Sequence, residues 1–369
     1  GAAVSYRQPY RLQNLLHWRP FCILFRGQRV TITDLVRQRG ANLRIFDMGR
    51  RIQPLDTALF EEIEQQRRSY PVPYLKHAWL ALLSWHPEQA GQHAIWFLKL
   101  PLDEQNLLDA PARDGFVRYV AQRQASGDST TDKGEAPFSF KPDGHRMAYF
   151  HALAARELGA PVSRFYGTTR GYLSGDIGWE NWQQLGLQGL AEVVAGYQQD
   201  NNQALLTRAL PYLPRVPLNV VLGFMENISP GQALTSAVND RLASVIAGEP
   251  DANDLAAFAR ALSHSENIEQ RRLLVQALLA HPKSRSVEVL AAVSSRCWAD
   301  LEGELLLAFL STLAVNEQGQ NAFAALVADM MTLPGMRQRM LAAFSSGQHS
   351  PQLDQAITRL LGIVRGQTQ

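Results

Sequence analysis

Residues 125–137 read ASGDSTTDKGEAP, and this stretch divides the chain into two parts with different patterns. It is small and polar, it contains two glycines, and it has no large apolar residue to anchor it in a core, which is the composition of a linker. We place the linker at residues 125–141. The sequence therefore predicts an α+β domain at residues 30–124 and an all-helical domain at residues 142–369.

The first domain combines strand-like and helix-like patterns. Residues 43–48 (LRIFDM) are rich in strand formers, and residues 74–85 with 93–100 (HAIWFLKL) predict a long antiparallel hairpin. Helices are expected from Ile32, after Asp56 and after Asp109, because an aspartate at such a position caps the first turn. These elements predict a small antiparallel sheet with helices beside it.

The second domain has only helical patterns. Residues 229–232 (SPGQ) combine an N-cap serine, a proline at the first helical position and a capping-box glutamine. From there we expect helices to begin near residues 231, 253, 266, 284, 302, 319, 335 and 350. A helix pair then takes roughly 34 residues, which is typical of helical-hairpin repeats. Because no residue signature recurs, a repeat and an irregular bundle both remain open.

Composition excludes several classes of protein. The chain has 369 residues, of which 46% are hydrophobic and 19% charged, an ordinary globular balance. Its two cysteines, Cys22 and Cys297, make neither a disulfide framework nor a zinc motif. No apolar run approaches the roughly 18 residues of a membrane span. We expect a cytoplasmic protein that does not insert into membranes.

Charge is concentrated at the N-terminus. Net charge is +2, but residues 1–30 hold five arginines and no acid. This segment, which we call the basic head, has the charge needed to bind nucleic acid. The simpler interpretation is that its arginines are exposed to solvent and bind nothing. Because residues 1–29 lack hydrophobic periodicity, we expect them to form an extension outside the fold.

The familiar catalytic motifs are missing from the sequence. It contains no GxxxxGK[ST], HExxH or GxSxG, and no GxGxxG after a strand. The histidines His77, His86 and His93 have no spacing known for metal ligands, so surface positions beside a turn explain them better. We therefore assign no catalytic residue, no metal ligand and no cofactor.

One weak binding motif lies at residues 47–51 (DMGRR), where a strand end leads into glycine and two arginines. The two guanidinium groups could form an anion fork, with the aspartate orienting one of them. A lysine and an aspartate of the hairpin would complete a site at the junction of the two domains. The binding candidates are thus Asp47, Arg50, Arg51, Lys99 and Asp103. The simpler interpretation is a tight turn whose exposed arginines are solvated or paired with Glu61 and Glu62.

Several longer strings carry a resemblance to a known family. They are residues 43–53 (LRIFDMGRRIQ), 77–80 (HAWL), 95–105 (IWFLKLPLDEQ), 138–142 (FSFKP) and 185–192 (LGLQGLAE). With them the chain resembles a family of uncharacterised bacterial proteins of about this length, catalogued as a domain of unknown function. The resemblance implies a bacterial cytoplasmic protein whose domain starts after the first 30 residues, and it implies no activity, cofactor or catalytic residue.

Three functions are compatible with these observations. The first is a non-catalytic interaction or scaffold protein that binds another protein through a helical-repeat surface. The second is an enzyme or small-anion-binding protein with its site at the domain junction. The third is nucleic-acid binding through the basic N-terminus. The missing motifs favour the first.

Overall fold

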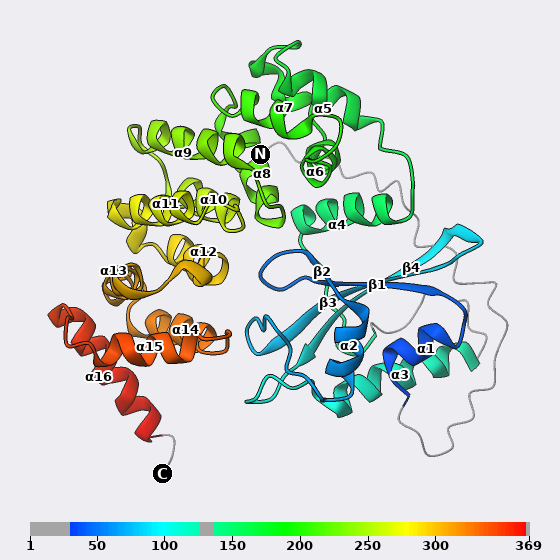
Figure 1. Cartoon of the computed structure of the whole chain (residues 1–369), viewed down its shortest axis with the longest axis horizontal. Helices are drawn as coiled ribbons and strands as arrows, with labels where there is room; N and C mark the ends of the chain where they lie inside the picture. Colours follow the sequence, from blue (N-terminus) through cyan, green and yellow to red (C-terminus); the bar gives the residue numbers. More distant parts are fainter. Residues whose placement is uncertain (1–29, 126–135, 367–369) are drawn as a thin grey trace. The chain divides into compact units, whose positions relative to one another are not determined.

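The computed structural model describes residues 30–125 and 136–366 (Figure 1). The basic head and most of the linker lie outside the described residues, so the expectations for them stay predictions. Backbone contacts divide the chain into two compact units, which we call the sheet unit and the helical unit. Among the described residues, the sheet unit comprises residues 30–47, Pro54–Tyr70, 77–125 and 136–141, and the helical unit comprises Met48–Gln53, Pro71–Lys76 and residues 142–366.

The sheet unit is built on four strands in the order β2-β1-β3-β4. They are β1 (Asn42–Asp47), β2 (Gln53–Leu55), β3 (His77–His86) and β4 (Gln89–Pro101). Both β1 and β4 pair with β3 in antiparallel register, so that Leu80 lies between Asp47 and Leu98. Leu80 and Leu98 are buried because alternate residues of each strand face the core. The predicted antiparallel hairpin is confirmed.

Three helices accompany the sheet, namely α1 (Ile32–Arg37), α2 (Thr57–Glu64) and α3 (Ala110–Ala125). Asp56 caps α2 by accepting a hydrogen bond from the backbone N–H of Leu59 at 2.9 Å. Asp109 caps α3 in the same way from the N–H of Ala112 at 3.1 Å. Local capping chemistry thus fixed both helix starts where the sequence predicts them.

A buried carboxylate ties two of these helices together. Glu64, at the end of α2, accepts hydrogen bonds from the N–H of Ile32 at 2.7 Å, and from the N–H and hydroxyl of Thr33 at 3.1 and 2.6 Å. Its side chain therefore satisfies donors in the first turn of α1 that have no partner within the helix. Burial raises the pKa of Glu64, and the hydrogen bonds from Thr33 and Ile32 oppose that rise.

From Pro142 onward, the described residues of the helical unit form only helices and their connections. Its α-helices are α4 (Gly144–Glu157), α5 (Phe165–Leu173), α6 (Leu187–Ala195), α7 (Asn202–Ala209), α8 (Arg215–Phe224), α9 (Gln232–Ile246), α10 (Ala252–Leu262), α11 (Ile268–Ala280), α12 (Val287–Arg296), α13 (Gly303–Ala314), α14 (Gln320–Met330), α15 (Met336–Ser345) and α16 (Pro351–Gly366). Short 3₁₀ turns are η1 (Trp179–Gln184), η2 (Met225–Asn227), η3 (Pro282–Arg285) and η4 (Trp298–Asp300). The expected helix starts from residue 231 onward agree closely with α9–α16.

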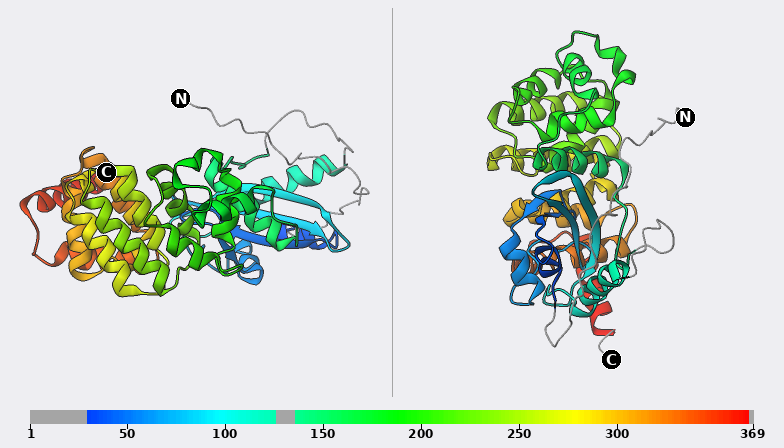
Figure 2. Two further views of the ribbon diagram at one scale, coloured as in Figure 1. Left: turned by 90° about the horizontal axis from the view of Figure 1, so that it is seen from above. Right: turned by 90° about the vertical axis from the view of Figure 1, so that its right-hand side faces the viewer.

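These helices pack in two rows. Each even-numbered helix contacts the next even-numbered one from α4 to α16, and each odd-numbered helix contacts the next odd-numbered one from α5 to α15. Figures 1 and 2 show successive helices of the unit lying side by side. The middle of the even row is almost wholly buried, as at Leu255, Phe258 and Leu262 of α10. This burial supplies the apolar core of the unit.

One glycine is required by close helix packing. A Cβ atom on Gly189 of α6 would lie 2.2 Å from the hydroxyl of Thr169 and 2.8 Å from the carbonyl oxygen of Phe165, both on α5. Any larger residue would push α5 and α6 apart, so glycine sets their spacing. Within the described residues, the structure has no helix with the length and apolar character needed to cross a membrane.

Replacement of the buried carboxylate is expected to destabilise the sheet unit. Glu64→Ala leaves three buried donors of α1 without an acceptor, so we expect the free energy of unfolding to fall by about 2–4 kcal/mol. Hydrogen exchange measures this locally, because the Ile32 and Thr33 amides should exchange faster. Glu61→Ala on the same helix is the control, since it breaks only the exposed pair with Arg37 and should cost less than about 1 kcal/mol. Equal losses would contradict this account.

The same carboxyl group gives a pH dependence. A group whose pKa is raised in the folded protein contributes stability below its unfolded pKa and loses that contribution as pH rises through its folded pKa. Because the pKa of Glu64 is raised, the stability advantage of the wild type over Glu64→Gln should shrink as pH rises above the ordinary glutamate pKa of about 4 and through the raised pKa of the folded protein. Chemical unfolding at a series of pH values measures this difference. A difference independent of pH would show that Glu64 does not titrate in this way.

Candidate functional site

Asp47 ends strand β1 and is held inside the sheet unit. Its side chain is 1% exposed, and one carboxylate oxygen accepts a hydrogen bond from the hydroxyl of Tyr70 at 2.5 Å. Burial and then the nearby Asp47 raise the pKa of Tyr70 well above its ordinary value. The pair is a buried structural contact of the sheet unit, in which Tyr70 satisfies one oxygen of the carboxylate.

Lys99 lies on β4, where its ammonium nitrogen is 4.5 Å from the centroid of the Trp79 ring. This is a cation–π contact. Lys99 pairs with Trp79 across the sheet, whereas Asp47 pairs with the next residue of β3, Leu80. Because successive residues of a strand point to opposite faces, the side chains of Asp47 and Lys99 lie on opposite faces of the sheet. The structure does not bring these two candidates together.

Asp103 follows β4 in an exposed turn. Its carboxylate accepts hydrogen bonds from the backbone N–H groups of Gln105 and Leu107 at 2.8 and 2.9 Å. Aspartate commonly closes a turn in this way. The observed role of Asp103 is therefore to shape the turn.

Arg50 is buried in the helical unit, so its interpretation as an exposed turn arginine is wrong. It is 3% exposed, and its guanidinium lies 2.8 Å from a carboxylate oxygen of Asp329 on α14. Two of its nitrogens also donate to the carbonyl oxygen of Pro73 at 3.0 and 2.8 Å. Burial lowers the pKa of Arg50 and Asp329 opposes this, but an arginine keeps its proton at physiological pH.

Asp329 holds a strained turn with its second oxygen. That oxygen accepts a hydrogen bond from the N–H of Leu75 at 3.0 Å. Leu75 and Lys76 have φ values of 49° and 58°, a left-handed conformation that costs side-chain-bearing residues free energy and persists only where other contacts fix it. The carboxylate of Asp329 supplies one such contact.

The segment Met48–Gln53 is held through its main chain. The N–H of Ile52 donates to the side-chain oxygen of Asn227 at 2.7 Å. Arg146 of α4 donates to the carbonyl oxygen of Gly49 at 3.0 Å and to that of Met48. Arg51 is hydrogen-bonded to the side chain of Gln53 at 2.8 Å. Side chains outside Met48–Gln53 thus form hydrogen bonds with the backbone of this non-helical segment.

One of the residues that hold these segments, Asp329, belongs to a regular series. The series is Glu226, Arg260, Arg296 and Asp329, at intervals of 34, 36 and 33 residues. Glu226 lies in η2 directly after α8, and the other three lie in the last turns of α10, α12 and α14. We call this series the ionic ladder. Arg296 lies 3.0 Å from one oxygen of Glu226 and Arg146 lies 3.8 Å from the other. The ladder was not singled out in the sequence, although its interval matches the length of a helix pair.

Arg260 differs from the other members of the ladder. Within the described part of the chain its guanidinium has neither a hydrogen bond nor an ion pair, and the side chain is half-buried. Burial and then the nearby Arg296 lower its pKa. Close by in sequence, His264 has its pKa lowered to about 3 by burial and by Arg51, Arg271 and Arg296, in that order. This part of the helical unit has more positive than negative groups.

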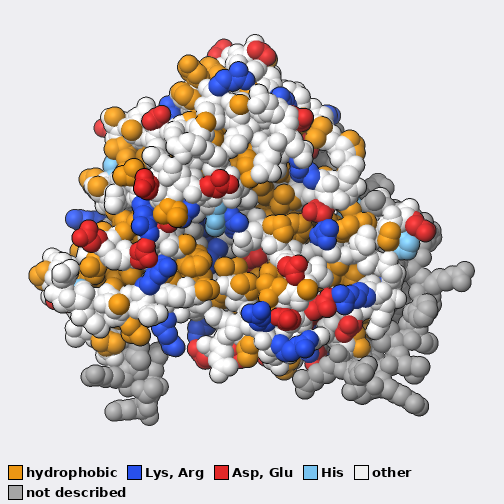
Figure 3. Space-filling view, viewed as in Figure 1, with side chains coloured by type: hydrophobic (Ala, Val, Ile, Leu, Met, Phe, Trp, Pro, Cys, Tyr) orange, Lys and Arg blue, Asp and Glu red, His pale blue; other side chains and the backbone are white. Residues whose placement is uncertain are grey.

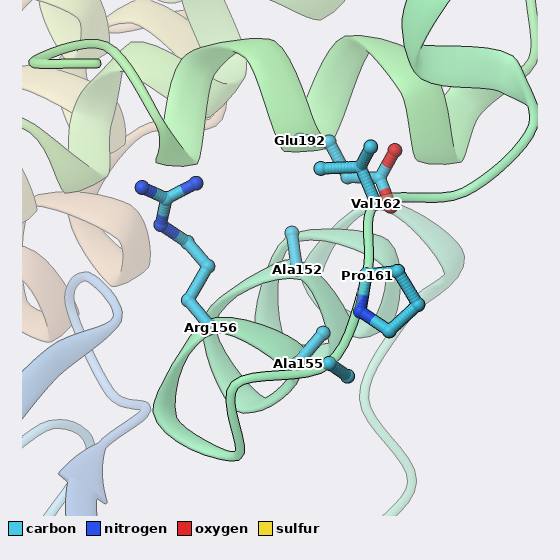
Figure 4. A pocket seen from close by; sticks show the side chains of 7 residues that line it. Ala152, Ala155, Arg156, Pro161, Val162 and Glu192 are labelled. Carbon is cyan, nitrogen blue, oxygen red and sulfur yellow. The ribbon is translucent and has the colours of Figure 1, made fainter.

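A small hollow lies between α4 and α6 (Figure 4). Its volume of about 20 Å³ is room for about one water molecule. The acid in its wall, Glu192, already accepts hydrogen bonds from the N–H and hydroxyl of Ser163 at 2.9 and 2.7 Å. Figure 4 shows the charged ends of Arg156 and Glu192 pointing apart. The hollow is too small for a substrate.

No metal centre is assembled by the side chains that the structure describes. Among these residues, no group of three or more histidine, cysteine, aspartate or glutamate side chains has the arrangement of metal ligands. The chemistry that the ionic ladder offers is recognition: arginine forks for oxyanions and carbonyl groups, and carboxylates for backbone N–H groups.

Removal of the charge on Asp329 tests the contacts of Arg50. In Asp329→Asn, Arg50 stays buried without its counter-ion, so we expect the free energy of unfolding to fall by about 3–5 kcal/mol. Asp251→Asn is the matched control, because Asp251 forms an exposed pair with Arg215 and its loss should cost less than about 1 kcal/mol. The double variant Arg50→Met with Asp329→Leu should recover part of the loss in chemical denaturation. A loss in Asp329→Asn no larger than that of the control would refute the buried ion pair.

Comparison with known proteins adds a family but no activity. The family model described as a protein of unknown function, DUF3549, matches residues 28–361. Searches of curated proteins and of solved structures give no match. Because the family model covers nearly all of the sheet and helical units, the chain belongs to the DUF3549 family.

Proposed function

We propose that this protein is a non-catalytic interaction protein whose helical unit is an array of helical-hairpin repeats that binds another protein. Two observations support a repeat. Each helix contacts the next but one along two rows, and the ionic ladder recurs at the interval of a helix pair. Stacked helical hairpins present an extended surface to a partner.

The observation that carries this proposal is the binding of main-chain groups by helix side chains. Asn227 and Asp329 accept hydrogen bonds from the N–H groups of Ile52 and Leu75, and Arg146 donates to the carbonyl of Gly49. Contacts of this kind hold a peptide in an extended or bent conformation. Protein recognition by helical surfaces uses the same chemistry.

The odd row supplies apolar anchors for a partner. Leu273 on α11 and Leu341 on α15 are 53% and 54% exposed. Figure 3 shows hydrophobic side chains between acidic and basic ones over α11 and α13, and Arg272 pairs with Glu302 there. Apolar anchors within a charged rim are typical of protein interfaces.

The carboxylates of the ladder region favour binding over catalysis. Glu226, Asp329 and Asp300 are each engaged by at least one arginine, and Asp300 accepts two hydrogen bonds of 2.7 Å from Arg271. A general base needs a lone pair free to take a proton from the substrate. The same region, at Arg260, favours small-anion binding as a second function.

We place the protein in the bacterial cytoplasm, as the family resemblance and its cysteine use support. Cys297 is a free thiol, 2% exposed, and burial raises its pKa to about 12. Such a thiol stays protonated and unreactive. A buried thiol that forms no disulfide within the described residues suits a reducing compartment.

Affinity purification of the full chain from its native cells, followed by mass spectrometry, tests the function. We expect one protein to be recovered in near-stoichiometric amount, and its recovery to fall at least about tenfold in Leu273→Asp with Leu341→Asp, because loss of apolar anchors weakens an interface. The matched control is Gln276→Asp with Gln338→Asp, which adds the same charges at exposed positions of the same helices. Recovery of a bound metabolite without any stoichiometric protein would overturn the proposal.

A further inference from the structure

The side chain of Arg260 is a cation without a counter-ion in the described part of the chain. It lies two residues before the end of α10, and no hydrogen bond or ion pair of its guanidinium is present there. The side chain is half-buried, and none of its nitrogens is among the buried atoms that lack a partner. These nitrogens are therefore within reach of a molecule from solvent.

The neighbours of Arg260 make the local charge positive. Arg296 and Arg146 lie near it and share a single carboxylate, Glu226. The thiol of Cys297 donates to the carbonyl oxygen of Ala259 at 3.3 Å, which fixes the end of α12 against this turn of α10. Three guanidinium groups with one carboxylate leave an excess of two positive charges. Repulsion of this kind costs a folded protein stability unless an anion relieves it.

We propose that Arg260, with Arg296 and Arg146, forms a binding site for a doubly charged oxyanion of the phosphate class. A dianion equals the local excess of charge. Guanidinium groups match the oxygen geometry of phosphate through paired N–H donors, and Arg260 has such donors free in the described part of the chain. Arg146 and Arg296 already donate to main-chain carbonyls and to Glu226, so their part in the site is to add positive charge. The site uses helical-unit residues alone and does not depend on the proposed protein partner, because an anion can bind with or without one.

His264 reports on the occupancy of this site. It lies in the turn after α10, and burial and then the nearby Arg51, Arg271 and Arg296 lower its pKa. Of these cations, Arg271 is paired with Asp300. These cations and burial together hold the pKa of His264 at about 3. An anion beside Arg296 would favour the imidazolium and raise that pKa.

Thermal unfolding of the full chain with added inorganic phosphate, at constant ionic strength, tests the site. The melting temperature of the wild type should rise with phosphate concentration, because a ligand of the folded state stabilises it. Arg260→Gln should lose this response and melt at an equal or higher temperature without phosphate, since the repulsion is relieved. Calorimetry should show at least about a tenfold loss of phosphate affinity. A merely structural Arg260 would give the opposite pattern, with a lower melting temperature and an intact response.

Two further variants keep the test specific. Arg260→Lys retains the charge but loses the fork, so its phosphate response should be weaker but measurable. Arg337→Gln removes an exposed arginine of α15 and should leave the response unchanged. Phosphoserine in place of phosphate distinguishes a phosphomonoester from the free ion, and acetate tests a single negative charge. An equal response of the wild type and Arg260→Gln, or no wild-type response to any of these anions, would overturn the proposal.

Nuclear magnetic resonance of His264 gives an independent measurement. Sulfate is the probe here, because it takes up a proton only at much lower pH than the phosphate dianion does and so carries more negative charge where His264 titrates. The pKa of His264 should rise above about 3 when sulfate is added to the wild type, and it should not respond in Arg260→Gln. A sulfate effect of the same size in both proteins would assign the change to general screening.

Discussion

The ion pair between Arg50 and Asp329 organises the non-helical part of the helical unit. One guanidinium contacts the carboxylate of α14 and the carbonyl oxygen of Pro73, and the same carboxylate accepts from Leu75. Both charges are almost fully buried, with side-chain exposures of 4% and 8%. A buried pair is tolerated only if its remaining hydrogen-bonding groups are satisfied. Here the backbone of Pro71–Lys76 provides that satisfaction, so the segment and the pair depend on each other.

This arrangement has a consequence for the charge of the ionic ladder. Its two carboxylates, Glu226 and Asp329, are already occupied by arginines and by main-chain groups of the same chain. Arg260, another member of the ladder, therefore forms no ion pair within the described part of the chain. Proteins usually neutralise a cation that is removed from water, because an unpaired charge there lowers the stability of the fold. The packing of the helices does not require an unpaired arginine at this position. Binding of an external anion, as proposed, would explain why Arg260 is there.

Local sequence signals predicted the elements, and long-range contacts determined the site. Caps such as Asp56 and Asp109 act within one helical turn, so the sequence shows them directly. Asp47 and Arg50 are three residues apart, yet they belong to different units and bind Tyr70 and Asp329 respectively. No residue near Arg50 in the sequence indicates that its partner is Asp329. The only sequence pattern that could have pointed to the site is the interval of about 34 residues between ladder members.

The contacts of the buried acids in the helical unit support the proposal of a binding protein over an enzyme. An enzyme needs an acid or base whose reactive atom faces a sheltered space, together with donors for the charge that develops in the reaction. In the described part of the helical unit, the buried acids of the ladder face arginines or main-chain N–H groups, and the small hollow beside Glu192 has room for about one water molecule. We propose that Arg260 and the exposed leucines of this unit bind an anion and an apolar surface, which needs no proton transfer from these side chains.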